Sequence, residues 1–464
     1  MAVSTPLLSQ PNSVKSESTD PPPLGKHHPS VDSTIERCIG DFGWTQFLQA
    51  LLVSSARTFD AQQTFITVFT DAHPTWHCTS HQLDCNSVSN ICNLPKNSWA
   101  WDLPAYTSII SEWNLERVTS IITGLPASSF FIGCLVGGLV LATLADSSLG
   151  LVGKRWRGQV GMMGFFTFTV GFLSLPAIAY LNRVSSWRSL HLWTSIPGIL
   201  YSRLVHFFVR ESPRWLFLHG RKEEAVATLK SLAPPSQSCR FSEVSFHQEM
   251  WNNGNVNSTI KMLVQKRWAF RRLLLVMVIG FGVGMVYYGM PLGLGNFSFN
   301  LYLGVVFNAL SEIPSSLFTI LLIGKLNGKF SVLAFTMISG IVSVMCALKG
   351  QLWTRFQIGL ELISFCSSCI SFNILLLFTI ELFPTCVRNS ATLLVRQATV
   401  FGGVFGTMLV AAERRDGISS YVVFGLVIGC CGLFAVCLPE TRGRSLFDTM
   451  DEEEHRDRNQ PAMV

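Results

Sequence analysis

The sequence predicts an all-α fold of the multi-pass membrane class, a helical bundle that crosses the bilayer about ten times. Of the 464 residues, 48% are hydrophobic and only 14% are charged, whereas soluble domains carry about 25% charged residues. The mean hydropathy is +0.36, and residues 273–288 hold no charge behind a basic cluster at 266–272. An apolar helix of about 20 residues spans a hydrocarbon layer of about 30 Å, so lipid is the main solvent of this chain.

Long apolar runs recur along the chain after residue 40. We count ten, at about residues 42–69, 118–145, 158–180, 188–209, 270–290, 299–323, 331–348, 356–380, 393–412 and 418–438. If the N-terminus is cytoplasmic, the cytoplasmic loops hold 19 Lys and Arg and the external loops hold 8. Cytoplasmic loops of membrane proteins are enriched in Lys and Arg. This asymmetry favours a cytoplasmic N-terminus, and it accounts for the net charge of +6 without a nucleic-acid partner.

One long polar loop divides the apolar runs into two unequal groups. The segments that we predict are a disordered cytoplasmic tail at 1–40, an incomplete N-terminal helical half at 41–209 with an external loop at 70–117, a cytoplasmic linker at 210–272, a C-terminal six-helix half at 273–440 and a cytoplasmic tail at 441–464. The first tail is rich in Pro, Ser and charged residues, a composition typical of disorder. The acidic run at 450–454 in the last tail is expected to be solvated.

The external loop contains three cysteines, Cys78, Cys85 and Cys92. In the predicted orientation this loop faces an oxidising compartment, so we expect one disulfide among the three. Because three is an odd number, one thiol is left unpaired.

An ordered set of short motifs extends from about residue 40 to residue 446. They are Trp-Ala-Trp at 99–101, Ser-Glu-Trp-Asn-Leu at 111–115, Trp-Arg at 187–188, Glu-Ser-Pro-Arg-Trp-Leu at 211–216, Val-Tyr-Tyr-Gly at 286–289, Glu-Ile-Pro at 312–314, Glu-Leu-Phe-Pro-Thr at 381–385 and Pro-Glu-Thr-Arg-Gly at 439–443. Together they resemble the organic ion transporters of the major facilitator superfamily, most closely the plant organic cation/carnitine transporters. The resemblance implies two six-helix halves around a central cavity, which move a solute by alternating access.

The chain departs from this family pattern at three places. Residues 146–158 join the second apolar run directly to a segment that resembles the entry to the family's fifth span, so the third span and most of the fourth are missing. We therefore expect a major facilitator-like bundle of about ten spans instead of twelve. Arg117 stands where the family usually has a cysteine. Val400 stands where animal members have an acidic or a basic residue, so the charge of the solute does not carry over.

Charged side chains inside a span are costly, so each is a candidate functional residue. Arg57 and Asp60 lie three residues apart on one helix face, with Gln63 nearby. They form either a polar patch for a solute or proton, or a self-neutralising structural pair. Glu312 precedes Pro314, which can free backbone carbonyls, and the family places this acid near the solute path. It is either a cation contact or a helix-pairing residue.

Aromatic and charged side chains complete the candidate solute site. Tyr287 and Tyr288 offer ring faces suited to a quaternary ammonium group, although aromatic residues at span ends also act as interface anchors. Arg396 and Glu361 are further candidates. Both lie near span ends, where long side chains can instead reach the interface.

Acidic and basic residues at the predicted cytoplasmic helix ends form three candidate gating pairs. They are Glu211 with Arg214, Glu381 with Arg388, and Glu440 with Arg442. Charge-assisted pairs of this kind can hold one conformation closed and separate in another; the alternative is ordinary helix capping. Small-residue patterns at 133–137 and 402–406 predict close helix contacts. They indicate packing and not a binding or catalytic site.

The predicted function is membrane transport of small organic ions. The resemblance implies organic cations or carnitine-like zwitterions as solutes, with a proton or sodium as coupling ion. The bilayer is the remaining partner, and the plasma membrane or the vacuolar membrane is the expected location. No metalloprotease, nucleophile-elbow or phosphate-loop pattern occurs, so neither an enzyme nor a cofactor is predicted. One alternative is a truncated, non-transporting membrane protein. Another is a sugar-type major facilitator carrier, against which the motif at 111–115 argues.

Overall fold

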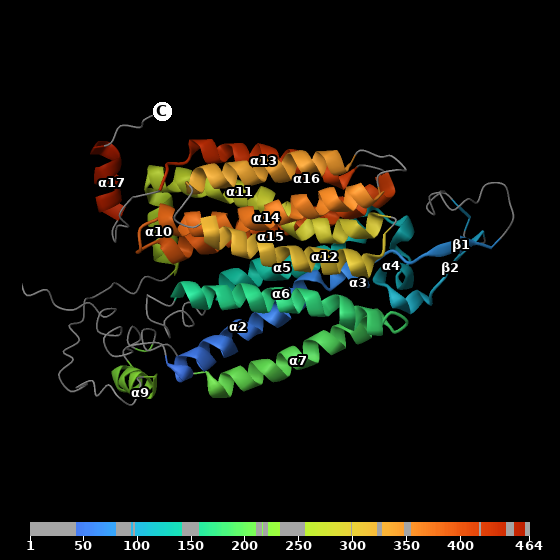
Figure 1. Cartoon of the computed structure of the whole chain (residues 1–464), viewed down its shortest axis with the longest axis horizontal. Coiled ribbons are helices and arrows are strands. Elements are labelled where there is room, and N and C mark those ends of the chain that lie inside the picture. Colours follow the sequence, from blue (N-terminus) through green and yellow to red (C-terminus); the bar gives the residue numbers. More distant parts are fainter. Residues whose placement is uncertain are drawn as a thin grey trace, which may run out of the picture.

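In the described part of the computed structural model, ten long helices form the body of the molecule, and they occupy the ten predicted apolar runs. The structure describes residues 43–79, 94–95, 98–141, 157–209, 216, 221–232, 256–297, 299–322, 327–347, 354–416, 419–441 and 450–459. The long helices are α2 (Trp44–Phe65), α5 (Ser120–Leu141), α6 (Arg157–Leu181), α7 (Trp187–Phe208), α11 (Arg267–Gly293), α12 (Leu301–Leu322), α13 (Gly328–Cys346), α14 (Thr354–Leu382), α15 (Arg388–Asp416) and α16 (Ser420–Leu433). They lie side by side along the long axis of the molecule (Figure 1). The predicted all-α, multi-pass fold is confirmed.

Eight of these helices are long and apolar enough to cross a membrane by themselves, whereas α2 and α7 are not. Polar side chains explain the difference. In α2, Gln62 donates a hydrogen bond to Ser174 of α6 (2.8 Å), and Gln63 donates one to Thr194 of α7 (3.0 Å). Polar residues of a span are tolerated where they are buried against protein. Packing between helices, and not hydropathy alone, therefore stabilises these two helices.

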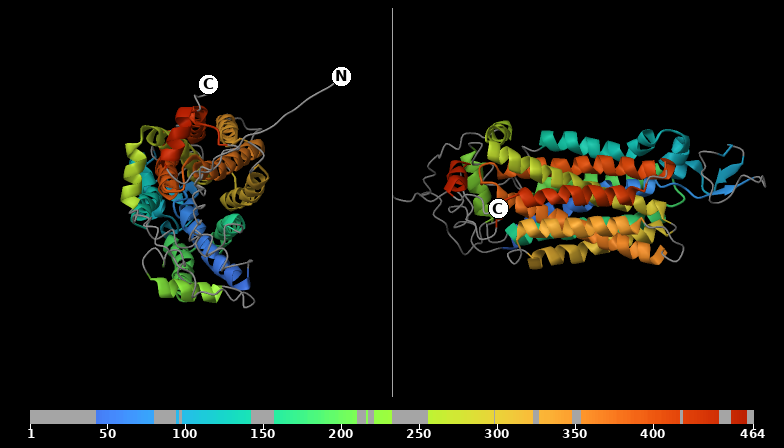
Figure 2. Two further views of the ribbon diagram at one scale, coloured as in Figure 1. Left: turned by 90° about the vertical axis from the view of Figure 1, so that its left-hand side faces the viewer. Right: turned by 90° about the horizontal axis from the view of Figure 1, so that it is seen from above.

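Short elements lie at the two ends of the bundle, as the views in Figures 1 and 2 both show. One end carries α3 (Thr67–Thr70), β1 (Trp76–Cys78), β2 (Trp99–Trp101), η2 (Ala105–Thr107), α4 (Ile109–Glu112) and η3 (Leu115–Arg117), and the other carries α9 (Lys222–Leu232), α10 (Val256–Gln265) and α17 (Met450–Asn459). β1 and β2 pair antiparallel, with Trp76 opposite Trp101. The elements η8 (Leu294–Asn296) and η10 (Phe434–Cys437) extend α11 and α16. The described parts of the predicted external loop and of the predicted cytoplasmic linker thus lie at opposite ends of the bundle.

Glycines bring α11 and α15 into close contact. A Cβ atom added at Gly284 of α11 would lie 2.0 Å from the carbonyl oxygen of Thr399, and one added at Gly402 of α15 would lie 2.2 Å from that of Phe281. Small residues allow two helix backbones to approach each other in this way. The close contact predicted for 402–406 is confirmed.

The corresponding prediction for 133–137 is wrong. A Cβ atom added at Gly133 or Gly137 would meet nothing within 4 Å, and Val136 between them is 63% exposed. Within the described residues α5 packs mainly on α15, so this face of α5 has no described helix against it. The predicted junction of the missing spans lies mostly in 142–156, outside the described residues.

Two links tie the loop between α3 and α5 together. Cys78 is disulfide-bonded, as the sequence predicted for this loop, and its partner lies outside the described residues. Arg117, which stands where the family usually has a cysteine, donates a hydrogen bond from Nη2 to the carbonyl oxygen of Leu94 (2.6 Å). A hydrogen bond therefore joins these two parts of the loop.

The acidic run at 450–454 is only partly solvated: Asp451 and Glu452 are exposed, as predicted, whereas Glu453 and Glu454 are partly buried against the basic cluster at the start of α11. Lys266 Nζ lies 3.1 Å from Asp451 Oδ1 and also contacts Glu454, while Arg272 Nη1 lies 3.1 Å from Glu453 Oε1. The side chains of Arg272 and Glu453 are only 10% and 12% exposed. The sequence did not show this contact, because the partners are separated by about 180 residues.

We expect Glu453→Gln to lower the free energy of unfolding by about 1–2 kcal/mol, because Arg272 stays buried and loses the charged contact with the Glu453 carboxylate. Thermal unfolding in lipid nanodiscs measures the loss. The combined variant Arg272→Gln, Glu453→Gln provides the control in a double-mutant cycle. Additive effects of the two single changes would contradict a direct interaction.

Candidate functional site

Glu312 of α12 is buried at the junction between helices from both parts of the chain. Tyr287 of α11 donates a hydrogen bond from Oη to Glu312 Oε1 (2.6 Å). Thr169 of α6 donates from Oγ1 to Glu312 Oε2 (3.2 Å). Glu312 is only 5% exposed. Both carboxylate oxygens thus accept a hydrogen bond, and the acid joins helices that precede and follow the 210–272 linker.

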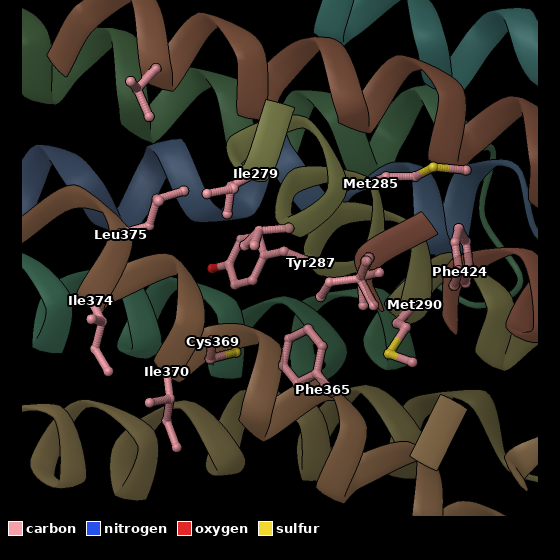
Figure 3. Close-up of a cluster of buried hydrophobic side chains, with 14 of the residues drawn as sticks. Ile279, Met285, Tyr287, Met290, Phe365, Cys369, Ile370, Ile374, Leu375 and Phe424 are labelled. Carbon is pink, nitrogen blue, oxygen red and sulfur yellow. The ribbon is translucent and has the colours of Figure 1, made fainter. Parts of the chain in front are cut away.

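Aromatic rings surround Tyr287 on several sides. Its ring stacks with Phe365 and Phe372 of α14, at centroid distances of 5.8 and 5.0 Å. Phe65 of α2 and Tyr288 approach edge-on, at 6.1 and 5.0 Å. Figure 3 shows Tyr287 and Phe365 within the buried core. We call Glu312 with Tyr287, Phe65, Phe365 and Phe372 the acid–aromatic cluster. A carboxylate next to ring faces is suited to attract an organic cation.

A second group, which we call the charged cluster, consists of Arg57, Asp60, Arg396 and Tyr288. Arg57 interacts electrostatically with Asp60 and Arg396, and also with Tyr288. Asp60 and Arg396 are exposed, whereas Arg57 is half-buried. The ring contact between Tyr288 and Tyr287 connects this cluster to the acid–aromatic cluster. The structure therefore brings together six of the eight predicted solute residues, whereas Gln63 and Glu361 lie outside both clusters.

Gln63 contacts α7 and neither of the two clusters. Its amide nitrogen contacts Thr194 Oγ1 (3.0 Å) and Ser195 Oγ (3.4 Å), both in α7. This arrangement gives Gln63 a role in packing α2 against α7, and its solute role stays a prediction.

The predicted gating pairs are only partly described. Glu211, Arg214 and Arg442 lie outside the described residues. Glu381 accepts a hydrogen bond from Thr441 Oγ1 (2.7 Å). Arg388 donates from Nε to the carbonyl oxygen of Phe383 (3.4 Å), and Glu440 accepts from the backbone N–H of Thr441 (3.1 Å). The hydrogen bond between Glu381 and Thr441 ties the end of α14 to the segment after η10, and the ionic pairs stay predictions.

An ionic contact that the sequence did not predict joins two of the motifs at the β1–β2 end of the bundle. Glu112 Oε2 accepts hydrogen bonds from Trp187 Nε1 and Arg188 Nη1, each at 2.6 Å. The Arg188 guanidinium also lies 4.4 Å from the centre of the Trp187 ring. The hydrogen bonds from Arg188 are the main cause that holds the pKa of Glu112 below its ordinary value, and the hydrogen bond from Trp187 is the second cause.

This lowered pKa predicts a stability difference that depends on pH. The contribution of Glu112 is fully present above the ordinary carboxyl pKa of about 4.3 and is lost as the pH falls through its lower pKa in the folded protein. Glu112→Gln should therefore lower the unfolding temperature at neutral pH by a small amount, since exposed ion pairs contribute little. The difference from the native protein should disappear in strong acid. A difference that stays constant on acidification would contradict this role.

Four residues of the site were not predicted from the sequence: Thr169, Phe65, Phe365 and Phe372. Thr169 is a common polar residue in an apolar run, and the chain contains 34 Phe. The spacing of seven residues between Phe365 and Phe372 places them on one face of a helix. That spacing could have indicated an aromatic face in α14, but it is equally typical of ordinary core packing.

A bundle of membrane-spanning helices, with ionic and aromatic side chains buried where its two parts meet, defines a membrane transporter. The family model described as sugar (and other) transporter matches residues 153–452. The chain belongs to this family of transporters, and transport rather than catalysis is its class of function.

Several curated proteins are similar over nearly the whole chain. Organic cation/carnitine transporter 3 of Arabidopsis thaliana is 54% identical, with 98% of each chain covered. Organic cation/carnitine transporter 2 of the same plant is 49% identical, over 94% of this chain and 96% of the relative. Among solved structures, the proton:xylose symporter XylE bound to 6-bromo-6-deoxy-D-glucose has a TM-score of 0.50 at 16% identity, covering 89% of this chain and 98% of that one. The last similarity shows the shared fold.

The alignment also bears on the predicted missing spans. It runs over 516 positions, whereas this chain has 464 residues, so at least 52 positions have no residue of this chain. Two spans of about 20 residues each, with their loop, account for a difference of this size. The position of the difference at 146–158 stays a prediction.

Proposed function

We propose that this chain transports small organic cations and carnitine-like zwitterions by alternating access, in the plasma membrane or the vacuolar membrane. The observation that carries the proposal is the buried carboxylate of Glu312 beside the stacked rings of Tyr287, Phe365 and Phe372. The printed names of the plant relatives agree with this solute class.

The acid–aromatic cluster provides the cation site. A quaternary ammonium group cannot donate an N–H hydrogen bond, so a carboxylate and aromatic ring faces are the groups that bind it well. Glu312 contributes the charge, and Tyr287 offers its ring and holds the carboxylate in place. Binding of a cation at Glu312 would compete with the hydrogen bond from Thr169, which links α6 to α12.

The charged cluster provides the second half of a zwitterion site. Arg57 and Arg396 outnumber Asp60, so this cluster carries a net positive charge and suits a carboxylate. Tyr288 connects it to the cation site. A carnitine-like solute, with an ammonium group at one end and a carboxylate at the other, can contact both clusters.

Uptake into proteoliposomes that contain the purified full chain tests the proposal. Radiolabelled tetraethylammonium and carnitine should enter saturably, and excess unlabelled solute should compete while xylose should not. The absence of saturable uptake above empty vesicles would contradict the proposal. In that case, inserting the corresponding segment of a relative between Gly150 and Leu151 tests the truncated, non-transporting alternative, which predicts that transport appears only after the insertion.

We expect Arg396→Gln to affect the uptake of carnitine and the uptake of tetraethylammonium differently. Loss of a charge-assisted contact of about 1.4 kcal/mol weakens carnitine uptake about tenfold. Tetraethylammonium has no carboxylate, so its uptake should change much less. The ratio of kcat/KM for the two solutes measures the effect. An equal loss for both solutes would indicate a structural role for Arg396.

A further inference from the structure

A second buried acid lies in the described structure outside both clusters. Glu361 of α14 and Asn308 of α12 are each 0% exposed. Asn308 donates a hydrogen bond from Nδ2 to Glu361 Oε1 at 3.0 Å. Neither residue has a part in the proposed solute contacts.

This pair leaves two oxygens without hydrogen-bond partners, Glu361 Oε2 and Asn308 Oδ1. Both are acceptors, and a buried acceptor that lacks a donor is costly. A single proton on Glu361 Oε2 would give both oxygens a hydrogen-bond partner. The new O–H group would donate to Asn308 Oδ1, while Asn308 Nδ2 continued to donate to Glu361 Oε1. The result would be a closed cyclic pair between an amide and a carboxylic acid.

The surroundings of Glu361 also favour a proton over a metal cation or a bare carboxylate. The titratable groups in electrostatic contact with Glu361 in the described structure are Cys346 of α13, Cys369 of α14 and Tyr421 of α16. Glu413 of α15 acts on Cys346 and Tyr421 in turn. All of these groups are neutral or acidic, so none balances a buried negative charge. Hard metal cations take about six or more oxygen ligands, and the pair offers two free oxygens.

The pair lies one helical turn from the acid–aromatic cluster, on the same two helices. Asn308 precedes Glu312 by four residues on α12, and Glu361 precedes Phe365 by four residues on α14. Residues four apart share a helix face. Phe365 stacks on Tyr287, which holds Glu312. A shift between α12 and α14 that separates Asn308 from Glu361 would therefore also disturb the contacts of Glu312.

We propose that Glu361 and Asn308 form the proton-binding site of this transporter and that proton movement through it is coupled to solute movement. The proton binds Glu361 Oε2 in the conformation described here. It leaves when α12 and α14 separate and water reaches the carboxyl group. The coupling rests on the proposed solute transport, whereas proton binding by the pair does not.

Infrared spectroscopy of the full chain in proteoliposomes tests proton binding directly. Acid-minus-alkaline difference spectra should show a carboxylic-acid carbonyl band that disappears in Glu361→Gln. This variant should fold, because its amide can donate to Asn308 Oδ1 and accept from Nδ2. The matched control is Glu413→Gln, whose native carboxylate accepts hydrogen bonds from Asn296 and Ser420 (2.6 Å each); it should keep the band. A band that persists in Glu361→Gln overturns the proposal.

Uptake driven by an imposed pH gradient tests the coupling. Accumulation of tetraethylammonium in the native protein should rise with the gradient, and Glu361→Gln should lose this stimulation while still exchanging labelled for unlabelled solute. Stimulation that survives in Glu361→Gln overturns the coupling. A native protein that shows the band without any solute uptake would support the proton site and contradict the proposed function, so the two failures are distinguishable.

Discussion

Glu312→Gln is expected to reduce the uptake of a quaternary ammonium solute by on the order of a hundredfold. The change removes the negative charge and keeps an oxygen that can accept the hydrogen bond from Tyr287. Loss of about 2–3 kcal/mol of interaction with the cation corresponds to roughly thirty- to a hundred-and-fortyfold, because about 1.4 kcal/mol is a factor of ten. Initial rates of tetraethylammonium uptake into proteoliposomes measure the effect as kcat/KM.

Two further variants show whether the loss comes from the charge. Tyr287→Phe keeps the aromatic ring and removes the hydroxyl group, so its loss should be smaller than that of Glu312→Gln. Glu413→Gln removes a carboxylate in α15 whose described partners are Asn296 and Ser420, and it should leave uptake close to that of the native protein. Native rates in Glu312→Gln would show that the cation binds elsewhere.

The spans and the main acid of the site could be predicted from the sequence because each follows from a local property. A run of apolar residues is sufficient to place a helix in lipid, and all ten predicted runs contain one. Glu312 stood out because a charge within a span is costly. The neighbouring Tyr287 stood out because aromatic faces bind organic cations. Neither inference needed any knowledge of which helices are neighbours.

The contacts that the sequence did not predict depend on which helices are neighbours. No single segment of the sequence contains that information. Thr169 reaches Glu312 only because α6 packs on α12, 143 residues further along the chain. The polar composition of the acidic run at 450–454 predicts a solvated segment, because its basic partners lie far away in sequence. The pattern at 133–137 was read as a helix contact because small residues permit close approach. Small residues allow a second helix to pack closely, but they do not show that a second helix is present.

The glycines of α11 provide the prediction with the largest expected effect on stability. In Gly284→Ala the new methyl group would lie 2.0 Å from the carbonyl oxygen of Thr399, a backbone atom that no side-chain rotation can move away. Helices α11 and α15 would have to separate, and α15 carries Arg396 on the same segment. Overpacking of this kind costs about 1–3 kcal/mol or more. We expect a lower unfolding temperature in nanodiscs and reduced uptake of both solutes.

Gly429→Ala in α16 is the matched control, because a methyl group added there meets nothing within 4 Å. Both changes replace a helical glycine by the residue with the highest helix propensity, so propensity alone would stabilise each helix by up to about 1 kcal/mol. Only the contact with α15 distinguishes them. Gly429→Ala should therefore be neutral or stabilising where Gly284→Ala is destabilising. Equal unfolding temperatures for the two variants would mean that α11 and α15 do not pack backbone against backbone in the membrane.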